Sequence, residues 1–150
     1  MMNLGKILVP TDFSGYSDQA LLWGASLAER YGAQMLLLHV IPQAVEGVSM
    51  HGSEGEQRIM DLEAKVEEQL HEIALEDVGE RLPVDVKIAM GKPAEEILRL
   101  AREVGVDLIV MGTHGHRELH QLLLGSTAET VFHNAPCPVF MVRIAAEGTP

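Results

Sequence analysis

Short apolar runs alternate with amphipathic patterns along this chain of 150 residues. Four runs are apolar almost throughout: Ile7 to Val9, Met35 to Val40, Leu108 to Met111 and Val139 to Val142. Such runs are typical of strands that are covered on both faces of a parallel sheet. A fifth run, Val84 to Ile88, alternates apolar and polar residues, which predicts an edge strand with one wetter face.

The segments between these runs predict four helices, over residues 17–32, 59–73, 92–105 and 126–132. Gly32 and Gly105 are suited to end the first and third helices, and Pro93 suits the first turn of the third. In the fourth helix we expect Ala128, Val131 and Phe132 to face the core. The segment from Pro42 to Gly55 has no periodicity and predicts a loop, either a mobile flap over a site or an ordinary surface loop.

This alternation predicts one α/β domain over residues 1–150, with right-handed crossovers between its strands. We expect a doubly wound, five-stranded parallel sheet of order 3-2-1-4-5 with helices on both faces. Ligands of such sheets bind beyond the carboxyl ends of the strands, where the strand order reverses. Here that point lies between the first and fourth strands, so Pro10, Thr11 and Asp12 should meet the segment from Gly112 to Gly115.

Glycines after the fourth strand form a pattern suited to phosphate binding. Gly112 and Gly115 are followed by Gly125, which opens a predicted helix and precedes Ser126 and Thr127. Glycines let backbone N–H groups approach an anion, and a helix start adds the positive end of its dipole. A Walker A loop is excluded because no lysine lies between Gly112 and Thr127. The dinucleotide fingerprint is excluded because three glycines do not fall within six residues directly after the first strand.

This spacing resembles the ATP-binding branch of the universal stress protein family, and the resemblance extends from Lys6 to Arg143. The segments Ile7 to Ser14 and Ala135 to Val139 also match the family's pattern. The resemblance implies that ATP is the ligand and that its adenosine lies near Asp12, with the adenine edge at the backbone of Val40. It also implies ribose contacts from Met111 and Gly112, and a phosphate site made by Gly115, Gly125, Ser126 and Thr127. Arg117 is the best cationic candidate for the phosphates.

Alternative roles stay open for several of these residues. Asp12 could instead cap the first helix or form an Asx-turn with Ser14. His39 is expected to be a hydrogen-bonded residue of the core or the pocket wall. The roles of His114, His116 and His120 are undetermined, because a metal site usually needs a carboxylate or cysteine companion.

Composition narrows the function classes further. The net charge of −11 argues against a nucleic-acid partner, because such proteins need clustered lysine and arginine. The single cysteine, Cys137, fits a reducing compartment and is expected to be buried rather than reactive. No run approaches the ~20 apolar residues of a membrane helix, so we expect a cytoplasmic protein without a membrane partner.

The sequence therefore predicts a stress-response sensor or regulator that holds ATP, with Mg or Mn entering through the phosphates. A slow ATP hydrolase and a nucleotide-free interaction module remain alternatives, and no catalytic residue is assigned. We also expect a homodimer through the last strand, because this edge strand is apolar and has no interior charge to deter pairing. Its residues are Val139, Phe140, Met141 and Val142.

Overall fold

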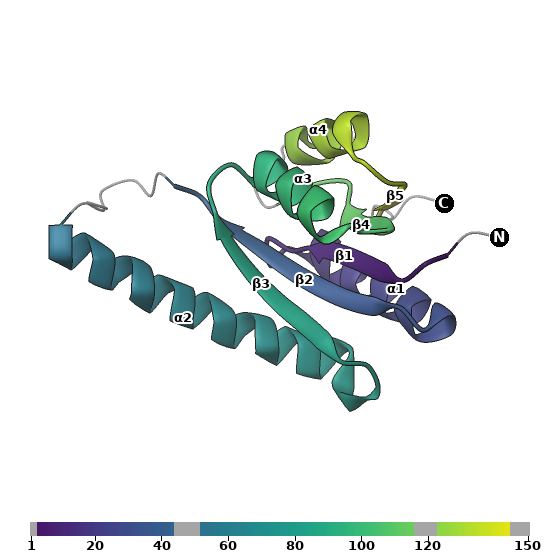
Figure 1. Cartoon of the computed structure of the whole chain (residues 1–150), viewed down its shortest axis with the longest axis horizontal. Helices are drawn as coiled ribbons and strands as arrows, with labels where there is room; N and C mark the ends of the chain where they lie inside the picture. The colour runs from purple at the N-terminus through teal and green to yellow at the C-terminus, as the bar shows by residue number, and fades with distance from the viewer. Residues whose placement is uncertain (1–2, 44–51, 116–122, 145–150) are drawn as a thin grey trace.

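The computed structural model describes residues 3–43, 52–115 and 123–144, which form one five-stranded parallel sheet flanked by helices (Figure 1). The strands are β1 (Lys6–Pro10), β2 (Gln34–Ile41), β3 (Val84–Met90), β4 (Leu108–Gly112) and β5 (Val139–Val142). The helices are α1 (Gly15–Tyr31), α2 (Gly52–Asp77), α3 (Pro93–Val104) and α4 (Ser126–Asn134), with a short 3₁₀ turn at Gly79–Arg81. The strand order is β3-β2-β1-β4-β5, which confirms the predicted topology.

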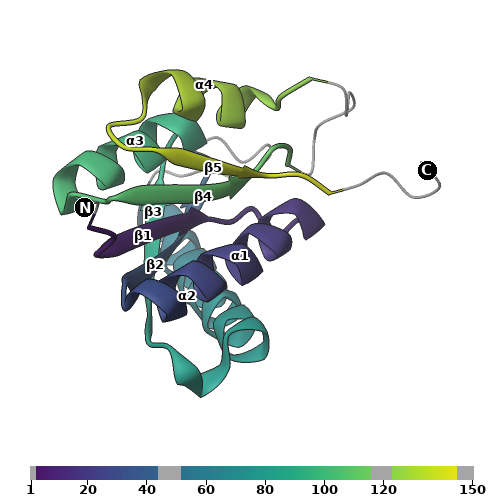
Figure 2. The ribbon, with the colours of Figure 1, turned by 90° about the vertical axis from the view of Figure 1, so that its right-hand side faces the viewer.

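Helices cover both faces of the sheet, α1 and α2 on one side and α3 and α4 on the other (Figure 2). Residues of β1 alternate between the two cores: Ile7 and Val9 pack with α1 and α2, while Leu8 packs with α3 and α4. This burial on both faces explains why the central strands are apolar throughout. In β3, Asp85 and Lys87 are exposed between partly buried apolar residues, as expected for the edge strand.

Local capping sets the ends of α1. The Ser14 side chain accepts a hydrogen bond from the backbone N–H of Ser17, so the helix begins at Gly15, slightly before the predicted start. Gly32 ends the helix with a φ of 66°, a left-handed conformation that favours glycine. Gly105 ends α3 in the same way, and Pro93 opens it, as predicted.

Two predictions about the helices were wrong. The segment from Pro42 to Gly55 is not all loop, because α2 begins at Gly52, while residues 44–51 lie outside the described residues. Glycines at positions 52 and 55 weaken the helical signal there, although Gly55 is buried. Phe132 is 56% exposed, because one residue past buried Val131 the helix has turned about 100° away from its core-facing side.

Among the described residues, no helix combines the length and the apolar character that crossing a membrane would require.

Candidate functional site

A cavity of about 480 Å³ opens beyond the carboxyl ends of the central strands. Ten of the eleven predicted site residues line it: Pro10, Thr11, Asp12, Val40, Met111, Gly112, Gly115, Gly125, Ser126 and Thr127. The eleventh, Arg117, lies outside the described residues, as do His116 and His120. The topology thus brings together segments that lie a hundred residues apart in the sequence.

The start of α4 forms one wall of this cavity. Gly125 is the N-cap residue; its N–H donates to the Thr113 carbonyl at 2.8 Å, and its own carbonyl accepts the first helical bond, from Glu129. The N–H groups of Thr127 and Ala128 precede that bond and therefore have no partner within the helix. With the helix dipole behind them, these donors can bind an anion such as a phosphate. Gly125 has a φ of −62°, a conformation that any residue can adopt. What glycine contributes at this position is therefore the absence of a side chain beside the cavity.

Gly112, the last residue of β4, and Gly115 both lie in close contact with the segment that follows β1. A Cβ on Gly112 would lie 2.7 Å from the Tyr16 Cβ and 3.0 Å from the Tyr16 carbonyl carbon. A Cβ on Gly115 would overlap the Asp12 carboxylate oxygen Oδ2. Neither glycine has a positive φ. The pair therefore lets the start of α1 and the Asp12 side chain approach β4 closely.

Asp12 is held by its own loop while it faces the cavity. Its Oδ1 accepts hydrogen bonds from the Ser14 N–H at 3.0 Å and the Ser17 hydroxyl at 3.2 Å. The first of these is the Asx-turn that the sequence left as an alternative. Phe13 lies between Asp12 and Ser14 in this turn. Its φ is 65°, which is rare for a residue with a side chain. Asp12 therefore serves the turn and lines the cavity at once.

His39 and Val40 form the wall on the β2 side. The Nδ1 of His39 lies 2.7 Å from the Thr11 carbonyl, and since a carbonyl only accepts, Nδ1 must carry the proton. The imidazole also packs on the Phe13 ring, with centroids 4.6 Å apart, so the expected role of His39 in the pocket wall is confirmed.

The backbone of Val40 faces the space that β1 leaves when it ends. Pairing of β1 with β2 stops at Pro10 opposite Leu38, and the Thr11 N–H donates to the Leu38 carbonyl. Alternate residues of a strand direct their N–H and C=O to opposite neighbours. The N–H and C=O of Val40 therefore point toward the cavity, where they offer one donor and one acceptor side by side.

His114 ties the glycine turn to the start of α4. One ring nitrogen contacts the Thr113 hydroxyl at 2.9 Å, and the other contacts the Leu123 carbonyl. Both nitrogens are thus engaged within the protein. No group of three or more His, Cys, Asp or Glu side chains suited to a metal ion occurs among the described residues.

The acidic charge of the chain is concentrated away from this cavity. Helix α2 contains nine acidic residues and two basic ones, and it packs on the opposite face of the sheet from α4. Among the described residues that line the cavity, Asp12 is the sole carboxylate. An anionic ligand at the start of α4 is therefore separated from the most acidic helix by the sheet.

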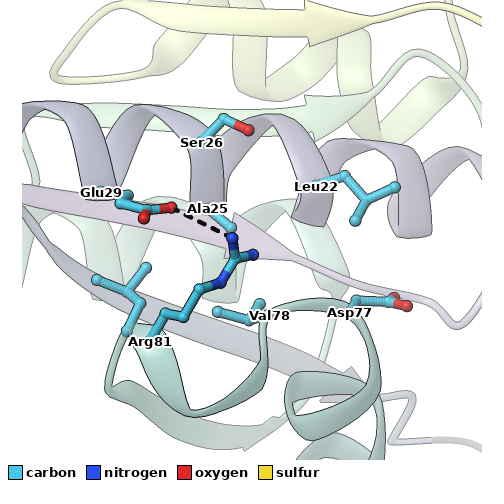
Figure 3. A pocket seen from close by; sticks show the side chains of 8 residues that line it. Leu22, Ala25, Ser26, Glu29, Asp77, Val78 and Arg81 are labelled. Carbon is cyan, nitrogen blue, oxygen red and sulfur yellow. Dashed lines mark ion pairs between the residues drawn. The ribbon is translucent and has the colours of Figure 1, made fainter.

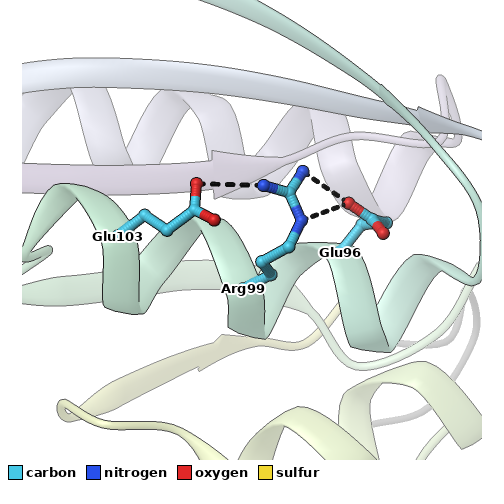
Figure 4. Close-up of polar contacts among 3 residues, drawn as sticks. All are labelled: Glu96, Arg99 and Glu103. Atoms are coloured by element: carbon cyan, nitrogen blue, oxygen red, sulfur yellow. Dashed lines mark hydrogen bonds and ion pairs between the residues drawn. The ribbon is translucent and has the colours of Figure 1, made fainter.

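Two other charged features do not belong to this site. A smaller cavity of about 140 Å³ lies between α1 and the end of α2, where Arg81 and Glu29 approach to 3.9 Å (Figure 3). Burial, followed by the charges of Asp18 and Glu76, raises the pKa of Asp77 beside it. On α3, Arg99 bridges Glu96 and Glu103 along the exposed surface (Figure 4). Neither feature places hydrogen-bond donors for an anion at the carboxyl end of a strand.

Sequence reasoning missed several residues of the site. Ser17, Pro93, Ile97 and Ala128 line the cavity but were not predicted to do so. Pro93 and Ala128 lie in the first turns of α3 and α4. The start of a helix at the carboxyl end of the sheet is the sequence signal that could have predicted them as lining residues.

Comparisons with known proteins agree with this architecture. The model of the universal stress protein family matches residues 3–143. Universal stress protein MJ0577 of Methanocaldococcus jannaschii is 34% identical over 92% of this chain and 94% of its own length. Its solved structure superposes with a TM-score of 0.79 at 32% identity, and covers 97% of this chain and 100% of that one.

Two more distant structures share the fold. One is a universal stress protein in complex with cAMP, at 20% identity and a TM-score of 0.69 over 96% of this chain and 100% of that one. The other is the universal stress protein of Archaeoglobus fulgidus in complex with dAMP, at 19% identity and a TM-score of 0.59 over 93% and 98%. The family match spans nearly the whole chain, and the solved structure of a relative shares its fold, so this protein belongs to the universal stress protein family.

Proposed function

We propose that this protein binds ATP in the cavity beyond β1, β2 and β4 and acts as a dimeric regulator in a stress response. The adenine edge would meet the N–H and C=O of Val40, the ribose would lie near Asp12 and Met111, and the phosphates would lie at the start of α4. Arg117 is the proposed cationic partner of these phosphates.

One observation carries this proposal: the first turn of α4 and the Asp12 carboxylate line the same cavity. N–H donors at a helix start suit phosphate, and a carboxylate suits the hydroxyl groups of a ribose. The Val40 backbone offers one donor beside one acceptor, which complements the N1 acceptor and the amino group of adenine. The proteins of this fold that hold cAMP and dAMP are consistent with an adenine nucleotide as the ligand.

A divalent ion would enter with the nucleotide. Phosphate oxygens are good ligands for Mg²⁺ and Mn²⁺, and the described lining offers a single carboxylate in addition. Slow hydrolysis of ATP in the same cavity is the alternative function, although Asp12, the sole carboxylate of the described lining, would lie at the adenosine end of the nucleotide and away from the phosphate that leaves. An interaction module that holds no nucleotide is the second alternative.

The proposed dimer forms through β5. This strand pairs with β4 alone among the described strands, and its Phe140 packs on Trp23 of α1 with ring centroids 5.5 Å apart. Both rings are well exposed, at 37% and 51%. The Val142 carbonyl accepts from Thr113 next to β4, so alternation directs the N–H of Met141 outward, to the open edge. We further infer a cytoplasmic location from the single cysteine.

In the first test, the purified protein is denatured and the small molecules that it releases are identified by mass spectrometry. Titration calorimetry then compares ATP binding by the parent protein and by Gly125→Val. Because the Gly125 backbone suits any residue, the variant should fold, while its branched side chain obstructs the phosphate site and abolishes binding. Unchanged ATP affinity in a folded Gly125→Val protein would refute the proposed site, and a parent protein that neither releases nor binds a nucleotide would favour the interaction module.

A further inference from the structure

A chain of hydroxyl groups runs beneath Asp12 and ends on its carboxylate. The Phe13 N–H donates to the Thr11 hydroxyl at 3.0 Å, and the Thr11 hydroxyl donates to the Ser17 hydroxyl at 2.9 Å. The Ser17 hydroxyl in turn lies 3.2 Å from Asp12 Oδ1 and 3.0 Å from the Ser14 carbonyl. Thr11 and Ser17 are buried, at 6% and 5% exposure, so water does not replace these bonds.

The direction of this chain is fixed at its end, because the Asp12 carboxylate and the Ser14 carbonyl can only accept. The Ser17 proton therefore goes to these acceptors, of which Asp12 is the charged one, and the Thr11 hydroxyl supplies the proton of its bond with Ser17. The Ser14 hydroxyl also lies 3.5 Å from the Ser17 hydroxyl. A charged acceptor strengthens a hydrogen bond, and aligned hydroxyl groups strengthen one another.

Two donors from the start of α1 hold one oxygen of the carboxylate. The Ser14 N–H and the Ser17 hydroxyl both donate to Oδ1. The other oxygen, Oδ2, lies against Gly115, a residue of the cavity wall. Ser17, a side chain of α1 that no binding motif of the sequence includes, therefore helps to orient Oδ2 in the cavity.

We infer that Ser17 is a positioning residue, which orients Asp12 to accept hydrogen bonds from ribose hydroxyl groups and so makes the site prefer a nucleoside triphosphate that carries them. This inference rests on the proposed function, because it assumes that the cavity binds ATP. It goes further by assigning the discrimination of the sugar to the chain from Thr11 through Ser17 to Asp12.

The experiment compares ATP with 2′,3′-dideoxy-ATP by titration calorimetry in three proteins. The parent protein should prefer ATP by at least about 10-fold, as expected for a hydrogen bond to a charged group. Ser17→Ala should weaken ATP binding and reduce the preference to within about threefold, because Asp12 loses its orientation. Ser26→Ala is the matched control: this serine of the same helix is exposed and does not line the proposed ATP cavity, so ATP affinity and the preference should both persist.

Thermal denaturation establishes that each variant is folded. Thr11→Val, which has nearly the same shape as threonine, breaks the chain one step earlier and should lower the preference in the same direction if Ser17→Ala does not fold. A folded Ser17→Ala protein that keeps the parent preference would overturn the inference. Strong ATP binding without any preference in the parent protein would also overturn it and leave the proposed function intact, whereas absence of binding to both nucleotides would remove both.

Discussion

Replacement of Gly115 by alanine should weaken ATP binding through Asp12, although the new methyl group need not touch the ligand. The backbone of Gly115 has no positive φ, so alanine fits without strain in the main chain. Its Cβ would overlap Asp12 Oδ2, and the carboxylate would have to retreat by about 1 Å to restore ordinary van der Waals contact. The hydrogen bonds of Oδ1 with Ser14 and Ser17, now 3.0 and 3.2 Å, would then be stretched or lost.

The expected loss follows from the charge of Asp12. A hydrogen bond between a carboxylate and a ligand hydroxyl contributes about 1.5–3 kcal/mol, so its loss should raise the dissociation constant of ATP about 10- to 100-fold. Titration calorimetry measures this constant directly, and thermal denaturation measures the accompanying change in stability.

A second glycine separates this effect from a general loss of stability. Gly32→Ala places a side chain at a φ of 66° with no atom within 4 Å, so it should destabilise the fold by roughly 1 kcal/mol and leave ATP affinity unchanged. If folded Gly115→Ala binds ATP within twofold of the parent protein, the proposed role of Asp12 is wrong.

Three further predictions concern the edge strand, turnover and the thiol. Met141→Pro removes an outward N–H from β5 without removing a hydrogen bond to β4, so light scattering should show that this variant is a monomer. A monomeric parent protein would contradict the proposed dimer. With excess ATP and Mg²⁺ or Mn²⁺, phosphate release should stay well below the ~1–100 s⁻¹ of dedicated phosphoryl-transfer enzymes, and sustained turnover in that range would favour the hydrolase. Burial, followed by the charge of Asp107, raises the pKa of the Cys137 thiol. Iodoacetamide should therefore modify Cys137 more slowly in the folded protein at pH 8 than after unfolding in urea, and the rate in the folded protein should increase with pH. Equal rates in the folded and the unfolded protein would contradict this prediction.

The sequence by itself determined the sheet and the place of the site. Strands that are buried on both faces are apolar throughout, whereas an edge strand with one wetter face alternates apolar and polar residues. The sequence alone therefore placed β3 at the edge of the sheet. The strand order expected for a doubly wound sheet was confirmed, and with it the meeting of Asp12 with Gly112 and Gly115. Helix ends marked by Gly32, Pro93 and Gly105 were equally readable, because their backbone requirements are local.

Only the tertiary structure decided what depends on contacts between distant segments. The sequence presented Gly112 and Gly115 as glycines of the ligand site; the fold adds that Tyr16 and Asp12 approach them from a distant segment, which no local pattern reveals. Ser17 looked like an ordinary residue of a helix start until the fold placed its hydroxyl between Thr11 and Asp12. Periodicity records which side of a helix is buried, whereas a binding site also depends on which atoms of separate elements come within hydrogen-bonding distance, and that is fixed only when the sheet and its helices pack together.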